Sequence, residues 1–172
     1  AGHVLVDPGG ALCACGRRGC WGESVRPQRL VMQGLWAGAL KPPGGETVVD
    51  GRDLDLDVEV VDTLFTQLTA AADAGDERAA AILDRSIRNT AFYLSNLAAL
   101  LDIDRVVFGG PSWSRVERSY LEQLPARMAE IDMSILTHPV LLQGTAVGED
   151  VAAVGAACLV LDETFSPRVG RL

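Results

Sequence analysis

The chain lacks the features that would place it in a membrane or direct it out of the cell. Its 172 residues contain no uninterrupted apolar run of about 18 residues or more, which a transmembrane helix would need. The N-terminus has no basic region followed by an apolar stretch, which a secretory signal would have. We therefore expect a cytoplasmic protein with no membrane partner.

Basic residues are also scarce. Lys and Arg number 15 against 23 Asp and Glu, which gives a formal net charge of −8. Because a nucleic-acid-binding surface is normally basic, any contact with DNA would have to come from residues outside this chain. The sequence begins at Ala1 without an initiator Met, so we expect it to start within a longer protein or after processing.

Cysteine is rare but clustered. Three of the four cysteines, Cys13, Cys15 and Cys20, fall within eight positions, and His3 lies ten residues before the first of them. The fourth, Cys158, stands alone in a stretch rich in Ala and Val, where we expect a small core residue. An even number of cysteines in a secreted chain would suggest disulfides, whereas clustering beside a histidine favours a metal site.

The spacing of these four residues suits zinc. One imidazole and three thiolates complete a tetrahedral shell, which leaves no open position for catalysis and indicates a structural ion. Glycines at 16 and 19 allow the backbone to turn tightly around a small centre. Zinc is favoured over iron because there is one nitrogen donor, three sulfur donors and no second cluster motif. The alternatives are free thiols or a disulfide between two of the cysteines.

The order of predicted elements indicates an α/β fold, because strands and helices alternate toward the C-terminus. Apolar residues recur every three or four positions in the central helices, and Asp76 is suited to cap the second of these. Ser114 and Glu117 fit a capping box, and we expect Pro125 to kink or interrupt the helix that follows. The predicted strands are 3–7, 105–108 and 140–142; the predicted helices are 24–36, 58–74, 76–101, one from 114 and one from about 150 to before 167; residues 38–57 are predicted as a loop.

Several segments carry a resemblance to a known family. Gly2-His3, Val6-Asp7-Pro8-Gly9 and Cys13-Ala14-Cys15-Gly16-Arg17-Arg18-Gly19-Cys20 together resemble the signature of the ROK family (repressors, open reading frames and sugar kinases). Two downstream segments agree: 104–110 resembles the family's strand and Gly-Gly turn, and 154–157 resembles its C-terminal helix. The resemblance spans nearly the whole chain.

The resemblance implies an actin-like, ribonuclease H-like fold with two α/β lobes around a cleft. Residues 1–172 would form most of the C-terminal lobe, with a zinc knuckle over 3–20 and a helical and α/β remainder over 24–165. The N-terminal lobe and any DNA-binding domain would lie outside this chain. The zinc ligands implied are those that the spacing indicates: His3, Cys13, Cys15 and Cys20.

The resemblance also implies two sugar-binding residues. In the family the zinc-binding histidine contacts sugar hydroxyls, a role that would fall to His3. The family's glutamate two residues after the last zinc cysteine is replaced here by Gly22, so Glu23 is the nearby candidate. The alternative for Glu23 is a solvated surface carboxylate.

The expected function is sensing rather than catalysis, and no catalytic residue is predicted. Kinase members use a phosphate loop and a catalytic aspartate from the first lobe, and neither motif occurs in this chain. The family's nucleotide-side turn usually has a third glycine, replaced here by Pro111, which lacks an N–H donor. We expect the sugar-sensing and oligomerisation part of a ROK-type transcriptional regulator, with a sugar or sugar-phosphate effector and a homo-oligomeric state. The alternatives are the C-terminal half of an ATP-dependent sugar kinase and a degenerate structural or assembly module.

Overall fold

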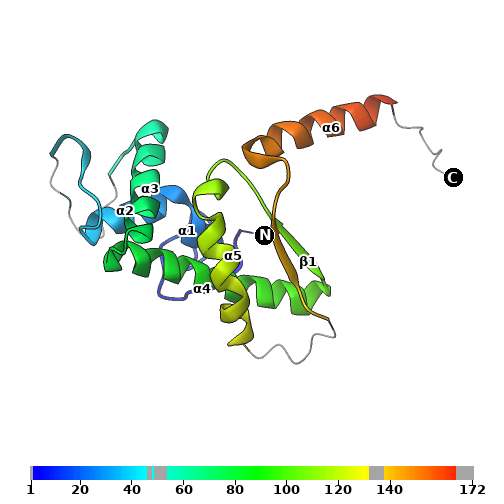
Figure 1. The fold of residues 1–172 in the computed structure, drawn as a ribbon, viewed down its shortest axis with the longest axis horizontal. Coiled ribbons are helices and arrows are strands. Elements are labelled where there is room, and N and C mark those ends of the chain that lie inside the picture. Colours follow the sequence, from blue (N-terminus) through cyan, green and yellow to red (C-terminus); the bar gives the residue numbers. More distant parts are fainter. Residues whose placement is uncertain (1, 46–47, 49–53, 132–137, 166–172) are drawn as a thin grey trace.

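The structure, a computed structural model, describes residues 2–45, 48, 54–131 and 138–165. Part of the predicted loop, at 46–47 and 49–53, lies outside the described residues. Figure 1 shows the arrangement of the helices and of the two strands. The helices are α1 (Trp21–Val25), α2 (Pro27–Trp36), α3 (Val58–Asp73), α4 (Glu77–Leu101), α5 (Glu117–Ala129) and α6 (Val151–Phe165); the strands are β1 (Arg105–Phe108) and β2 (Leu141–Gly144).

The predicted helix over 24–36 is wrong in its start and its continuity. Two helices, α1 and α2, are separated by Arg26, whose backbone is extended (φ −66°, ψ 122°). The ring of Pro27 disfavours a helical conformation for the residue before it, while proline itself suits the first turn of α2. The chain therefore bends between α1 and α2.

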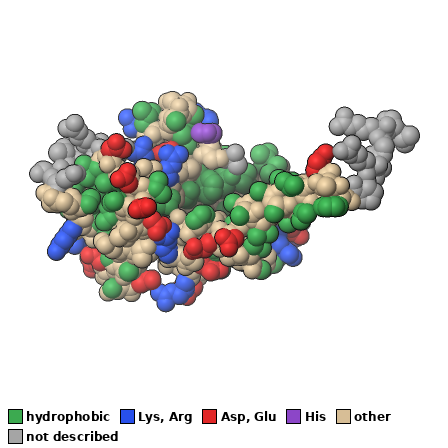
Figure 2. Space-filling model, turned by 90° about the horizontal axis from the view of Figure 1, so that it is seen from above, with side chains coloured by type: hydrophobic (Ala, Val, Ile, Leu, Met, Phe, Trp, Pro, Cys, Tyr) green, Lys and Arg blue, Asp and Glu red, His purple; other side chains and the backbone are tan. Residues whose placement is uncertain are grey.

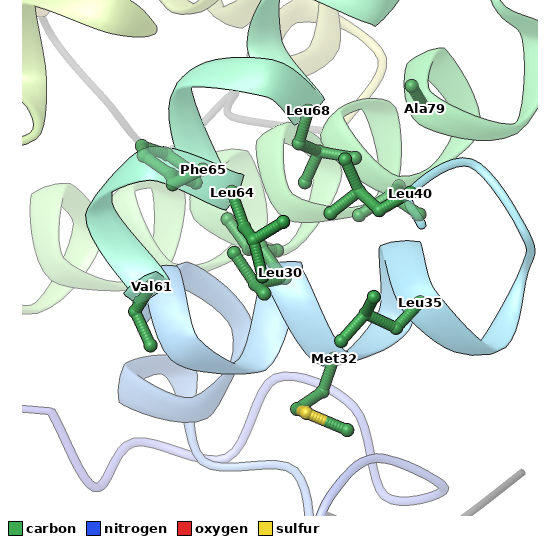
Figure 3. Close-up of a cluster of buried hydrophobic side chains, with 11 residues drawn as sticks. Leu30, Met32, Leu35, Leu40, Val61, Leu64, Phe65, Leu68 and Ala79 are labelled. Carbon is green, nitrogen blue, oxygen red and sulfur yellow. The ribbon is translucent and has the colours of Figure 1, made fainter. Parts of the chain in front are cut away.

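Helices α3 and α4 confirm the predicted helical pair. Asp76 caps α4, because its Oδ1 accepts hydrogen bonds from the backbone N–H groups of Arg78 and Ala79, both at 3.0 Å. The 25 residues of α4 make it long enough to contribute to two hydrophobic clusters among the described residues. One cluster joins α2, α3 and the start of α4 (Figure 3), and the other joins the rest of α4 to α5 and the sheet.

The two strands pair in parallel, with Arg105 opposite Leu141 and Phe108 opposite Gly144. Helix α5 lies between them in sequence, so the strand, helix and second strand form the α/β unit that the sequence predicts. The predicted strand over 3–7 is wrong: this segment makes one isolated antiparallel bridge, between Leu5 and Cys20. The ladder ends there because the amides of residues 6 and 7 both donate to the carbonyl of Gly19.

The start of α5 differs from the prediction. Ser114 lies in a 3₁₀ turn, Trp113–Arg115, and the residue that precedes α5 is Val116. The Ser114 hydroxyl donates to Glu149 at 2.6 Å instead of capping the helix. Pro125 lies inside α5, which continues past it to Ala129, so the proline does not interrupt the helix.

Helix α6 projects away from the rest of the structure (Figure 1), and hydrophobic side chains cover much of it (Figure 2). Every residue of α6 after Val151 is exposed, including Leu159 at 74% and Phe165 at 76%. Cys158 is exposed too, so its predicted place in the core is wrong. Among the described residues, no helix has the length and apolarity needed to cross a membrane.

Candidate metal centre and adjacent pocket

The four predicted ligands meet in space. The candidate ligand atoms of His3, Cys13, Cys15 and Cys20 all lie within 4.8 Å of one another. Cys13 Sγ is 3.4 Å from His3 Nδ1, and Cys15 Sγ is 3.5 Å from Cys20 Sγ. Ligand bonds of about 2.0–2.3 Å to a central ion place neighbouring donors of a tetrahedron roughly 3.5–4 Å apart. The residues therefore fit a metal ion bound by one nitrogen and three sulfurs.

Glycine turns build this centre, as the sequence indicates. Gly16 and Gly19 have positive φ angles of 85° and 73°, which glycine adopts without the steric cost of a side chain. The Cys13 amide donates to the Arg17 carbonyl at 2.8 Å, and the Gly16 amide donates to the Cys13 carbonyl at 2.9 Å. The loop thus folds back on itself and directs its cysteines to one point.

The thiols of the cluster differ in acidity. The backbone N–H of Arg17, followed by its guanidinium, lowers the pKa of Cys15 to about 6. Burial raises the pKa of Cys20 to about 11, in keeping with a side chain that is 0% exposed. The described cysteines are all free, and the 3.5 Å between the sulfurs of Cys15 and Cys20 is far longer than a disulfide bond of about 2 Å. The cluster is a set of thiols rather than a disulfide.

A polar pocket of about 590 Å³ lies between the loop at residues 7–19, α2 and α4. Glu23 lines it and is only 4% exposed, so the alternative of a solvated surface carboxylate is wrong. Its carboxylate accepts a hydrogen bond from Arg29 Nε at 2.8 Å and pairs with Arg26 at 3.3 Å. His3 is not among the lining residues, but its segment lies beside that of Glu23, because the Gly22 amide donates to the Gly2 carbonyl at 2.9 Å. The polar side chains that line the pocket are Asp7, Arg18, Glu23, Ser24, Arg29, Gln33, Arg85, Ser86 and Asn89.

A second, smaller pocket of about 250 Å³ adjoins the turn at Gly109, Gly110 and Pro111. Its walls are aromatic. Phe108 and Trp113 stack with ring centroids 4.7 Å apart, and Trp21 and Tyr120 also line the cavity. The sequence analysis missed this pocket, although aromatic residues on both sides of the Gly-Gly turn were a visible signal.

Sequence reasoning also missed the residues that line the polar pocket besides Glu23. Arg18 comes from the loop at residues 7–19, Ser24 from α1, and Arg85 and Asn89 from α4. These positions are separated by up to about 70 residues and follow no local spacing. No pattern in the sequence marks them as neighbours.

The chain is similar in sequence to sugar kinases. The N-acetylmannosamine kinase of Haemophilus influenzae (strain PittGG) is 26% identical over 166 residues, covering 94% of this chain and 45% of the relative. The N-acetylmannosamine kinase of Escherichia coli O139:H28 is 33% identical over 133 residues, covering 73% of this chain and 37% of the relative. The chain therefore spans less than half the length of these relatives.

Solved structures share the fold. A ROK family glucokinase from Streptomyces griseus, in complex with glucose and AMPPNP, aligns with a TM-score of 0.65 and 23% identity over 92% of this chain and 49% of the glucokinase. A ROK family transcriptional regulator, homologous to the E. coli MLC protein, aligns with a TM-score of 0.56 and 19% identity over 83% of this chain and 33% of the regulator. The mixed helix and strand architecture is thus that of ROK kinases and regulators. A model of the ROK family matches residues 1–163, and the chain belongs to this family.

Proposed function

We propose that residues 1–172 are the C-terminal lobe of a ROK transcriptional regulator, and that this lobe binds a structural zinc ion, senses a sugar and mediates oligomerisation. The observation that supports this most is the cluster of His3, Cys13, Cys15 and Cys20 beside a polar pocket. Three thiolates and one imidazole favour zinc over harder cations. The ion would hold the loop at 13–20 against the segment that begins at His3.

His3 is suited to act as metal ligand and sugar contact at once. Its Nδ1 faces Cys13 Sγ at 3.4 Å, so the imidazole can bind the ion through Nδ1 and keep Nε2 for another partner. The side chain is exposed, which leaves room for a sugar hydroxyl. Glu23 would contribute from the neighbouring pocket, where Arg26 and Arg29 hold its carboxylate.

Two features favour sensing over phosphoryl transfer. Gly22 stands where the resemblance places a sugar-binding glutamate. Pro111 lines the aromatic pocket at the Gly-Gly turn and provides no N–H donor.

The metal proposal is tested by elemental analysis of the purified protein. We expect about one zinc ion per chain, and Cys15→Ser should lower both the zinc content and the melting temperature because metal binding stabilises the fold. Cys158→Ser is the matched control, since this cysteine is exposed on α6. A native protein that is metal-free and fully stable would contradict the proposal.

The choice between regulator and kinase requires the complete gene product, including any residues encoded upstream of Ala1. A regulator should bind DNA in a way that a sugar changes, and it should transfer no phosphate. A second candidate function is that of an ATP-dependent sugar kinase. The two sequence relatives described above favour it, because both are N-acetylmannosamine kinases. ATP-dependent phosphorylation of a hexose or N-acetylhexosamine by the complete protein would establish that candidate and exclude ours.

A further inference from the structure

The polar pocket between the loop at residues 7–19, α2 and α4 contains cationic groups that the proposed function does not use. The Arg18 guanidinium makes one long hydrogen bond, to the Gly10 carbonyl at 3.5 Å. Arg85, on α4, has neither a hydrogen bond nor an ion pair in the part of the chain that the structure describes. Two guanidinium groups without carboxylate partners thus line one cavity of about 590 Å³.

The carboxylates of the same pocket are already engaged. Glu23 pairs with Arg29 at 2.8 Å, and also with Arg26 at 3.3 Å. Asp7 Oδ1 accepts a hydrogen bond from the Gly9 amide at 3.1 Å. Three arginines and two carboxylates line the cavity, so the pocket is locally positive although the chain carries a net charge of −8.

A fixed polar network forms one side of the pocket. Asn89 Nδ2 donates to Ser24 Oγ at 3.0 Å, and Ser86 Oγ donates to the Ser24 carbonyl at 2.7 Å. Ser86 Oγ also lies 2.6 Å from the Tyr120 hydroxyl. Ser86 and Tyr120 are both buried, so this network links α1, α4 and α5. It thereby holds in place the part of α4 that carries Arg85 and Asn89, which line the pocket.

We propose that this pocket binds a small molecule through a phosphate group, which Arg18 and Arg85 hold. The planar guanidinium presents paired N–H donors that match phosphate oxygens. The volume falls within the range of about 300–1,000 Å³ typical of small-molecule sites. His3 does not line this pocket, and the proposed phosphate site does not depend on whether the complete protein is a regulator or a kinase.

Calorimetric titration of the full chain at constant ionic strength tests this inference with three probes: inorganic phosphate, glucose 6-phosphate and glucose. Both phosphate-bearing probes should bind, and glucose should bind at least about tenfold more weakly than its 6-phosphate, as expected for the loss of a charge-assisted hydrogen bond. Tighter binding of glucose 6-phosphate than of inorganic phosphate would identify a phosphorylated small molecule as the ligand, and equal affinities would identify free phosphate. Failure of both phosphate probes to bind, or equal affinity for glucose and its phosphate, would overturn the inference.

Variants assign the binding to the pocket. Arg85→Gln and Arg18→Gln should each weaken binding of glucose 6-phosphate at least about tenfold. Arg88→Gln is the matched control: Arg88 lies one turn further along α4, pairs with Asp84 at 3.4 Å and does not line the pocket. Equal effects of Arg85→Gln and Arg88→Gln would overturn the proposal. Arg85→Lys, which keeps the charge but loses the paired donors, should bind with intermediate affinity and serves if Arg85→Gln does not fold.

Discussion

The backbone of Asp7 occupies the space in which a side chain at Gly19 would lie. The Gly19 carbonyl accepts hydrogen bonds from the amides of Val6 at 2.9 Å and of Asp7 at 3.2 Å. A Cβ atom on Gly19 would collide with the Asp7 carbonyl, and the residue also has a positive φ of 73°. The position of Cys20 relative to His3 therefore depends on the absence of a side chain at residue 19.

We predict that Gly19→Ala lowers the free energy of unfolding by about 2–4 kcal/mol, because it combines left-handed strain with a backbone collision. It should also reduce the bound metal. Gly16→Ala is the control, since Gly16 has a similar φ of 85° but no atom within 4 Å of an added Cβ, so only the strain of about 1–2 kcal/mol applies. Urea unfolding and elemental analysis measure both variants, and equal losses would contradict the packing argument.

The acidities of the thiols predict how metal affinity depends on pH. In the metal-free protein near neutral pH, Cys15 is a thiolate because its pKa is lowered to about 6. Cys20 keeps its proton, because its pKa is raised to about 11, and a bound metal ion must displace that proton. As the pH falls, we expect the metal affinity to decrease by about tenfold per pH unit for each proton that the metal displaces. The decrease should be steeper below about pH 6, where Cys15 is protonated as well. Competition with a chromophoric chelator across this range measures the slope, and an affinity independent of pH would contradict it.

The capping of α4 by Asp76 predicts that the stability of the fold also depends on pH. Hydrogen bonds from the Ala79 backbone N–H and then from the Arg78 side chain lower the pKa of Asp76 below its usual value. A lowered folded-state pKa means that the carboxylate stabilises the fold fully above the unfolded value and that this contribution is lost as the pH falls through the folded value. Asp76→Ala should cost about 1 kcal/mol near neutral pH, and the difference from the wild type should shrink at lower pH. Asp76→Asn, which retains a capping oxygen, should cost less in the same urea titrations.

Local patterns in the sequence predicted the elements whose stability is local. Helices α3 and α4 follow from apolar spacing and from the cap at Asp76. The cluster of one histidine and three cysteines follows because these four residues lie within 18 positions of the sequence. The break between α1 and α2 was predictable in principle from Pro27, but proline is also common in the first turn of a helix, so Pro27 was compatible with one helix over 24–36. The exposure of Cys158 was not predictable, because burial depends on what a helix packs against and not on its own sequence.

The residues of the polar pocket could not be predicted from local sequence patterns either. Arg18 and Arg85 have no sequence relationship, and they line one cavity only because α1, α2 and α4 pack together. Glu23 was identified through the family resemblance, yet its burial and its pairing with Arg29 became evident only in three dimensions. Residues brought together by tertiary packing leave no spacing signal in a single sequence.

The exposed helix α6 predicts self-association of the chain, in line with the oligomerisation that we propose. Helix α6 presents apolar side chains on all its sides, and Leu159 and Val160 are 74% and 66% exposed. A helix that is apolar all round is normally buried. We expect a species larger than one chain in analytical ultracentrifugation at micromolar concentration. Leu159→Glu should shift the equilibrium toward the monomer, because association would bury the added carboxylate without a partner. Ala80→Glu, which adds the same charge at an exposed position of α4, should leave the equilibrium unchanged. A wild-type chain that stays monomeric, or equal effects of the two substitutions, would rule out α6 as the contact surface between copies of the chain.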